Sequence, residues 1–328
     1  MIHRPDNRRR PLAACLAAGA LLLAACGGGG GGEAPGADGS LSIATGGTGG
    51  VYYPYGGGMA NVLSQNLQGV TASVQETNAS VDNVLLVQNG GADIAFALGD
   101  TVADALAGAA QFEGNRVDVC TLGRLYDNYT QTVTMSGTGI RTIADLRGKR
   151  VSVGSPGSGT EVIALRILEA AGINPDTDIQ RSQLGVGETA AALRDGTIDA
   201  GFWSGGLPTG ALIDLASTGQ MVLLPTGEYT AALAQKYGEY YQTAEIPAGT
   251  YQGQNEASPQ VVVPNVLIVR PDMPQQLQQD ITRVIFENKQ QLATVHPAAN
   301  DLDPATAGEV KFVPVCPGAQ AYFDRAAG

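Results

Sequence analysis

The sequence is poor in histidine, and this limits the chemistry that it can perform. Among 328 residues there are two histidines, His3 and His296. Histidine is the commonest protein ligand of zinc and the usual base of a serine triad. A histidine-rich zinc site is therefore excluded, and a Ser-His-Asp triad would have to use His296. We expect a protein that is not an enzyme and that needs no metal or cofactor.

Two glycine-rich segments come close to nucleotide-binding motifs, and each lacks one residue of the motif. Gly154 and Gly159 have the spacing of a P-loop, but Thr160 stands where the phosphate-binding lysine belongs. Gly47 and Gly49 begin a dinucleotide fingerprint that has Tyr52 in place of its third glycine. Both departures exclude nucleotide chemistry of the usual kinds.

Positive charge is also scarce. The chain has 19 lysines and arginines against 31 aspartates and glutamates, a net charge of −12. Residues 1–25 hold four arginines and one aspartate, which is +3, so the remainder carries −15. An acidic surface argues against nucleic acid and anionic lipid headgroups as partners. It does not exclude an acidic ligand, because a local group of backbone N–H donors can bind an anion at short range.

The chain begins with an apolar run that is too short for a membrane helix. Residues 12–25 are apolar or small and follow three arginines, a pattern typical of a signal peptide. Leu23-Ala24-Ala25-Cys26 is similar to a bacterial lipobox, which predicts a signal peptide over residues 1–25 and lipidation of Cys26. Residues 26–39 are glycine-rich and predict a flexible tether. We expect a lipoprotein anchored at the periplasmic face of a membrane; an ordinary cleavable signal is the alternative.

Four cysteines are present, and two of them are assigned to the N-terminal region. Cys15 leaves with the predicted signal peptide, and Cys26 is the predicted lipid site. The remaining pair, Cys120 and Cys316, predicts one disulfide in an exported protein. Two buried thiols are the alternative.

An internal repeat is the most informative feature that the sequence does contain. A strand, a glycine loop and a helix follow one another over residues 41–63 and again over residues 151–171. The pattern Gly-x-x-Asp-x-x-Phe then follows at 90–96 and at 196–202. Such alternation predicts two α/β lobes with largely parallel strands and a ligand cleft between them, at the strand ends where the glycine loops lie. We expect a first lobe of residues 40–135 plus 258–328 and a second lobe of residues 136–257.

The other elements are predicted from periodicity and turn residues. Ser80 is expected to be the N-cap of a helix over 80–87. Predicted strands cover 93–98, 117–125, 130–135, 221–224 and 261–269, and predicted helices cover part of 140–150, then 210–216, 229–241, 275–293 and a last segment ending near Asp324.

Several motifs together resemble the TAXI family, the TRAP-transporter-associated extracytoplasmic immunogenic proteins. They lie at 43–54 (IATGGTGGVYYP), 80–83, 91–96, 143–151, 157–160, 246–251 and 317–319, so the resemblance spans about residues 41–325. Cys316 departs from it, because a histidine is expected before Pro-Gly-Ala. The resemblance implies a type II periplasmic-binding fold that closes on glutamate, 2-oxoglutarate or a similar acid. It also implies delivery to a TRAP-type permease, and we expect a monomer.

The candidate ligand-binding residues lie at the starts of helices and the ends of strands in both predicted lobes. In the first lobe, backbone and hydroxyl donors are expected to bind a carboxylate, and tyrosines to wall the cleft: Thr48, Gly49, Gly50, Tyr52, Tyr53, Asn78, Ser80 and Asn83. In the second lobe they are Ser158, Gly159, Thr160, Trp203, Ser204 and Gly205. The alternative is core packing for the tyrosines and Trp203, and helix capping for Asn78, Ser80 and Asn83. Arg124, Arg166 and Arg181 are candidates for a carboxylate clamp, without a choice among them.

Three functions fit these observations. A solute-binding protein for an organic anion fits best. A periplasmic sensor on the same fold would bind a ligand equally well but dock on a signalling protein. An enzyme on this fold is disfavoured by the scarcity of histidine.

Overall fold

The computed structural model describes residue 36 and residues 39–326, which belong to one compact unit. The predicted signal peptide, Cys26 and most of the predicted tether lie outside the described residues. No helix in the described part is both long enough and apolar enough to cross a membrane.

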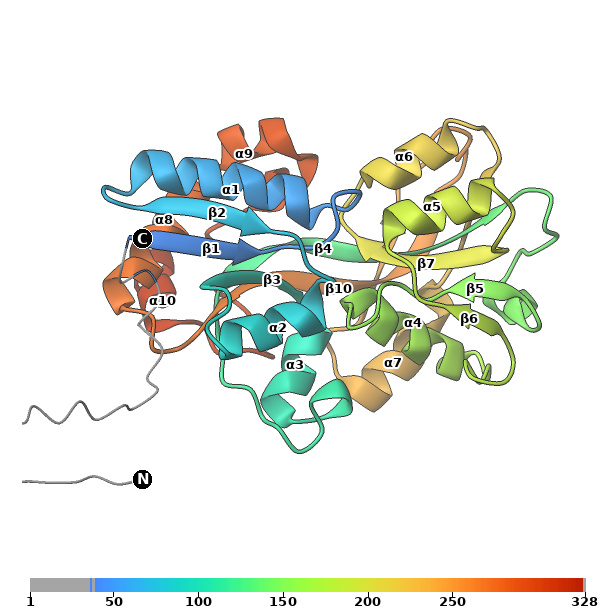
Figure 1. Cartoon of the computed structure of the whole chain (residues 1–328), viewed down its shortest axis with the longest axis horizontal. Helices are drawn as coiled ribbons and strands as arrows, with labels where there is room; N and C mark the ends of the chain where they lie inside the picture. Colours follow the sequence, from blue (N-terminus) through green and yellow to red (C-terminus); the bar gives the residue numbers. More distant parts are fainter. Residues whose placement is uncertain (1–35, 37–38, 327–328) are drawn as a thin grey trace, which may run out of the picture. The chain divides into compact units, whose positions relative to one another are not determined.

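One continuous sheet runs through the described residues, in the order β2-β1-β3-β10-β4-β7-β5-β6. Parallel strands lie at its two ends, where β1 pairs with β2 and β3, and β5 pairs with β6 and β7. Two long antiparallel strands, β4 (Cys120–Met135) and β10 (Ser258–Val269), connect these ends (Figure 1). The other strands are β1 Ser40–Ala44, β2 Thr71–Gln75, β3 Ile94–Leu98, β5 Arg150–Ser152, β6 Gln180–Ser182, β7 Ala200–Gly205, β8 Met221–Leu224 and β9 Gln242–Ile246.

Helices cover both faces of this sheet. In the view of Figure 1, α1, α5 and α6 lie above it and α2, α3, α4 and α7 below it. The α-helices are α1 Tyr52–Asn66, α2 Ser80–Gln88, α3 Gly99–Ala107, α4 Gly159–Ala170, α5 Val186–Arg194, α6 Gly210–Ala216, α7 Thr230–Tyr237, α8 Gln275–Glu287, α9 Lys289–Val295 and α10 Pro317–Ala326. Short 3-10 turns are η1 Ala110–Phe112, η2 Ile143–Leu146, η3 Gly227–Tyr229 and η4 Pro297–Asp301.

The predicted strand–loop–helix repeat is present as β1-loop-α1 and β5-loop-α4. The prediction of two strands over 117–125 and 130–135 was wrong, because β4 is a single strand. Its polar middle stays extended since β10 and β7 both supply hydrogen-bonding partners along it. The predicted helix over 229–241 was too long: α7 ends at Gly238, whose φ of 143° suits glycine, and β9 follows.

Three smaller predictions also differ from the structure. Ser80 is the first residue of α2 and not its N-cap, which is Ala79 with a φ of 78°. The helix expected within 140–150 is only the 3-10 turn η2, closed by a capping box between Thr142 and Asp145. The helix expected over 275–293 is broken at Asn288 into α8 and α9.

One face of β10 packs against two different hydrophobic clusters along its length. Val261 and Val263 pack in a cluster with α4, whereas Leu267 and Val269 pack in a cluster with α1 and α8. These four residues share one face of the strand, because side chains alternate along it. Asn265 lies between the two pairs, so the connecting strands cross from one core to the other at a polar residue.

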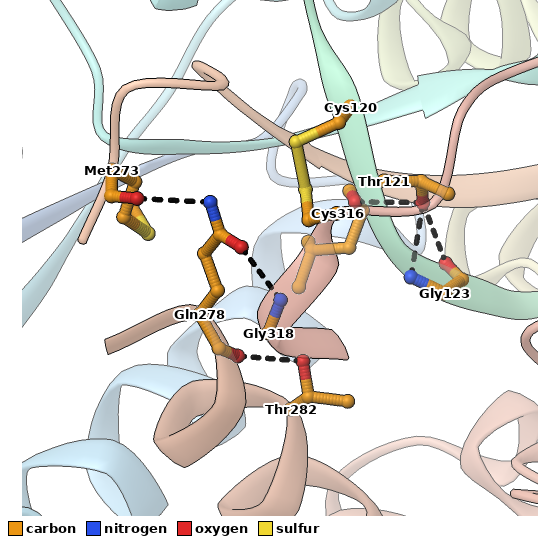
Figure 2. The surroundings of a disulfide bond; sticks show 9 residues. Cys120, Thr121, Gly123, Met273, Gln278, Thr282, Cys316 and Gly318 are labelled. Atoms are coloured by element: carbon orange, nitrogen blue, oxygen red, sulfur yellow. Dashed lines mark hydrogen bonds between the residues drawn. A yellow bond between two sulfur atoms is a disulfide. The ribbon is translucent and has the colours of Figure 1, made fainter. Parts of the chain in front are cut away.

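A disulfide between Cys120 and Cys316 ties the C-terminal segment to the start of β4. Both cysteines are buried, and the backbone N–H of Cys316 donates to the carbonyl oxygen of Thr121 at 2.9 Å. Figure 2 shows Gln278 beside them, bridging α8 and α10: its amide donates to Met273 and accepts from the N–H of Gly318. The C-terminal helix is thus held by a covalent bond and by a buried amide.

Candidate ligand-binding cleft

A cleft of about 740 Å³ lies where the glycine loops meet. Its walls come from residues 46–52 before and at the start of α1, residues 75–80 before α2, the loop before α4, the start of α5 and the end of β7. The cleft therefore lies at the carboxyl ends of the parallel strands, which is the usual ligand position in such sheets.

Four helices begin at this cleft. The first residues of α1, α2, α4 and α5 all line it, and these helices are 15, 9, 12 and 9 residues long. A helix N-terminus carries unpaired N–H groups and a partial positive charge of roughly half an electron. No side chain caps α1 or α2. The partial charges of four such ends around one volume favour an anion, although two N–H groups of α2 already donate to the carbonyl oxygen of Gly157.

Hydroxyl groups in the cleft are set to donate. Each of four buried hydroxyl oxygens accepts a hydrogen bond from the protein and still carries a proton that it can donate. The donors are Leu98 N–H to Ser80 Oγ (3.1 Å), Glu161 N–H to Ser158 Oγ (3.0 Å), Ser204 N–H to Thr160 Oγ1 (3.1 Å) and Asn265 Nδ2 to the Tyr52 phenol oxygen (2.6 Å). Burial raises the pKa of Tyr52, so its phenol keeps this proton.

The charged side chains that line the cleft are carboxylates. Within the described residues, its lining contains Glu76, Asp82 and Glu188 and no lysine, arginine or histidine. Each of the three carboxylates is held by an N–H group: Thr48 N–H to Glu76 (3.2 Å), Asn78 Nδ2 to Asp82 (2.8 Å) and Gly185 N–H to Glu188 (3.0 Å). An anion in this cleft would be bound by neutral donors and helix ends. It would also be repelled by the carboxylates.

The two predicted lobes touch on both sides of the cleft. On one side, the N–H groups of Val81 and Asp82 donate to the carbonyl oxygen of Gly157 at 3.1 and 3.3 Å. On the other side, the N–H of Ala211 donates to the carbonyl oxygen of Gly49 at 3.3 Å. Residues from the first predicted lobe thus meet residues from the second at both rims.

The profile of the NMT1-like family matches residues 43–326. The chain belongs to the NMT1-like family.

Solved structures show which fold this NMT1-like protein has. A binding protein component of an ABC phosphonate transporter from Pseudomonas aeruginosa is 10% identical, with a TM-score of 0.52 over 81% of this chain and 79% of that one. A protein of Bordetella bronchiseptica RB50 is 18% identical, with a TM-score of 0.50 over 85% and 83%. The predicted type II periplasmic-binding-protein fold is confirmed.

Most of the predicted site residues of this NMT1-like protein line the cleft. The exceptions are Tyr53 and Asn83. Asn83 is fully buried, and its amide donates to the carbonyl oxygens of Thr45 (2.7 Å) and Phe96 (2.8 Å), so it joins α2 to β1 and β3. The residues that do line the cleft are Thr48, Gly49, Gly50, Tyr52, Asn78, Ser80, Ser158, Gly159, Thr160, Trp203, Ser204 and Gly205.

Trp203 reaches from the second predicted lobe to the first glycine loop. Its indole N–H donates to Thr209 Oγ1 at 2.9 Å, which fixes the ring. A Cβ atom built on Gly50 would lie 2.8 Å from the ring. Gly50 is therefore required for the close approach of the loop to the indole.

The start of α5 was missed as part of the site. Residues 185–188 line the cleft, and Glu188 Oε2 accepts from the N–H of Gly185 in the manner of a capping box. A glutamate three residues into a helical stretch is a recognised signal for a helix start and could have located this wall.

The three candidate arginines all lie outside the cleft and are paired. Arg124 contacts Asp127 at 2.6 Å, Arg181 contacts Asp176 at 3.2 Å and Arg166 contacts Asp104 at 2.5 Å. The last pair joins α4 to α3 and is buried. The NMT1-like chain therefore has no arginine clamp among the described residues that line this cleft.

Proposed function

We propose that this chain is an extracytoplasmic solute-binding protein that captures a small organic anion and delivers it to a TRAP-type membrane permease. The observation that carries the proposal is the convergence of four helix N-termini and several donor hydroxyls on one cleft. Glutamate, 2-oxoglutarate and similar acids are the ligands that the resemblance to the TAXI family suggests. The predicted lipid at Cys26 would keep the protein at the membrane that holds the permease.

We further propose that residues 40–135 with 258–328 and residues 136–257 act as two lobes that close on the ligand. The long strands β4 and β10 connect them and would serve as hinges. Closure would bring the glycine loop before α1 and the start of α4 against opposite sides of the bound acid. The paired contacts at both rims support a closed arrangement.

Thermal unfolding with a panel of acids tests this proposal. The exported protein carrying Cys26→Ser would be unfolded and refolded to remove carried-over ligand, then heated with glutamate, 2-oxoglutarate, C4 dicarboxylates, monocarboxylates, neutral amino acids and sugars. An acid at 1,000 times its dissociation constant should stabilise by about 4 kcal/mol and raise Tm by several degrees. A response to sugars alone, or to no acid, would reject the anion cleft.

Tyr52 and Tyr53 provide a matched pair of variants. Tyr52→Phe removes a donor from the cleft and should weaken acid binding by about 1–3 kcal/mol, roughly 5- to 150-fold in the dissociation constant. Tyr53→Phe makes the same change outside the cleft lining and should leave the dissociation constant unchanged. Isothermal titration with the acid that raises Tm most measures both. Equal effects of the two variants would contradict the role of Tyr52.

A further inference from the structure

Buried polar atoms without partners lie in the strands that connect the two predicted lobes. Both amide atoms of Asn128, Thr130 Oγ1, Ser204 Oγ and Asn265 Oδ1 make no hydrogen bond. Asn128, Thr130 and Asn265 are 0% exposed and Ser204 is 7% exposed. Buried polar groups are normally hydrogen-bonded, so a group of exceptions in one place requires an explanation. We call these four residues the polar floor.

The polar floor is one surface. Asn128 and Thr130 point to the same face of β4, because they are two residues apart. Thr130 is paired with Ser204 of β7 across the sheet, which places their side chains together. Asn265 of β10 lies where the strand passes from one core to the other. Asn128 is paired with Val263 of the second core, and Asn265 with Tyr126 of the first, so the four side chains lie where the two cores meet.

The polar floor also adjoins the cleft. Ser204 lines it directly. Asn265 Nδ2 donates to the phenol oxygen of Tyr52, which lines the cleft as well. Asn128 is close enough to this phenol that their interaction lowers the pKa of Tyr52 against the larger effect of burial. Asn128, Thr130 and Asn265 do not line the cleft themselves and lie directly behind the residues that do.

We propose that the polar floor is a subsite for an uncharged hydrogen-bonding group of the ligand, such as a hydroxyl or a carboxamide. The proposal rests on the proposed function, in which the helix N-termini bind the carboxylate end of the same molecule. The floor offers donors and acceptors together, because an amide has both and a hydroxyl has both. An alkyl end of the ligand would leave these donors and acceptors unpaired.

Isosteric ligand pairs test the proposal. 4-Hydroxybutyrate has a hydroxyl group where pentanoate has its terminal methyl group. L-Threonine likewise has a hydroxyl group where L-valine has a methyl group. The refolded protein carrying Cys26→Ser would be titrated with each compound by calorimetry. We expect the hydroxylated member of a pair to bind at least tenfold more tightly.

Two variants on β4 separate this role from a structural one. Thr130→Val removes a hydroxyl from the polar floor while it conserves shape. Thr132→Val makes the same change two residues further on, at a side chain that is equally buried and also unpartnered. Thr132 is paired with Phe202 and Leu224, both in the core of the second predicted lobe. We expect Thr130→Val to reduce the preference for the hydroxylated ligand to threefold or less. Thr132→Val should retain the full preference.

The outcomes are distinct. If both members of each pair bind equally, or if both variants change the preference alike, the subsite is wrong while the proposed function stands. If neither these compounds nor any acid of the panel binds, the proposed function fails, and the subsite fails with it.

Discussion

At the scale of single residues, the proposed site would bind an anion without basic side chains, since its described lining has none. Ser80 and Thr160 show how: each accepts one backbone N–H at 3.1 Å, so its hydroxyl proton points elsewhere. Each hydroxyl therefore keeps a proton that it can donate to a ligand. The arginines serve a different purpose, since the most buried one, Arg166, lies between α3 and α4.

Asp104, which forms an ion pair with Arg166, is a residue whose protonation depends on pH near neutrality. Arg166 shares its charge between Asp100 and Asp104, and the Tyr241 hydroxyl donates to Asp100 at 2.6 Å. Burial, with the charge of Asp100, raises the pKa of Asp104 to about 6 although Arg166 opposes the shift. Burial also raises the pKa of Asp100. Two carboxylates for one guanidinium leave an excess of buried negative charge, which favours proton uptake.

We predict that Asp104→Asn alters the pH dependence of stability. The folded pKa near 6 exceeds the ordinary value of 3.8, so the folded form binds this proton more tightly. The stability that proton binding by Asp104 contributes is fully present below pH 3.8, and it is lost as the pH rises through about 6. The free energy of unfolding of the wild type minus that of Asp104→Asn should fall between pH 4 and 6.5 in urea titrations. Val102→Ala, on the same helix, should give a constant difference. A difference that rises with pH would mean that the ion pair with Arg166 dominates.

At the scale of elements, glycines decide how closely the helix ends approach one another. A Cβ atom on Gly159, the first residue of α4, would lie 2.4 Å from Leu98 Cδ1 and 2.7 Å from Ser80 Oγ. Both neighbours belong to the first predicted lobe. Gly187, in the first turn of α5, also lines the cleft but has no atom within 4 Å of its Cβ position. Substitution by alanine should therefore affect ligand binding differently at the two helix starts.

We predict that Gly159→Ala weakens ligand binding tenfold or more, whereas Gly187→Ala leaves it unchanged. The methyl group at 159 would hold the lobes apart, and an open form relieves the clash, so Tm without ligand should change little. Isothermal titration with the best acid of the panel, together with Tm of the free protein, measures both effects. Tight binding by Gly159→Ala would show that α4 and the start of α2 do not come this close in the complex.

At the scale of the whole molecule, the sequence predicted the architecture better than its details. The repeated glycine loops and the Gly-x-x-Asp-x-x-Phe pattern depend on local backbone requirements, so they located β1-α1 and β5-α4. Asp93 and Asp199 illustrate this, since each accepts a backbone N–H at the start of its strand pair, from Ser42 and Arg150. The partners of Arg166 and the polar floor depend on strands far apart in the sequence. No local pattern could show them.

The length of β4 has the same explanation. Its middle residues 126–129, between the two predicted strands, include Asp127 and Asn128 and look like a break between strands. They stay extended because β10 and β7 flank them, and that pairing joins residues more than 60 positions apart. Asn128, which belongs to the polar floor, lies in this stretch.

We predict that the free protein opens about the buried contact between α3 and α4. Arg166, Asp100 and Tyr241 are nearly inaccessible to water and join the two lobes, so separating them would leave charges buried without partners. The hydrogen bonds at the rims join backbone groups, whose partners water can replace. Rotation should therefore break the rims and keep the α3–α4 contact.

X-ray scattering and hydrogen exchange together check this motion. A compact chain of this size has a radius of gyration of about 19 Å, and the best acid of the panel should reduce the measured value. Without ligand, the amides of Val81, Asp82 and Ala211 should exchange faster, because their acceptors across the cleft move away. The amides of α3 should exchange at the same rate in both states. Rim amides that stay equally protected, with an unchanged radius, would mean that the lobes do not move. The acid would then have to enter a cleft that is already closed.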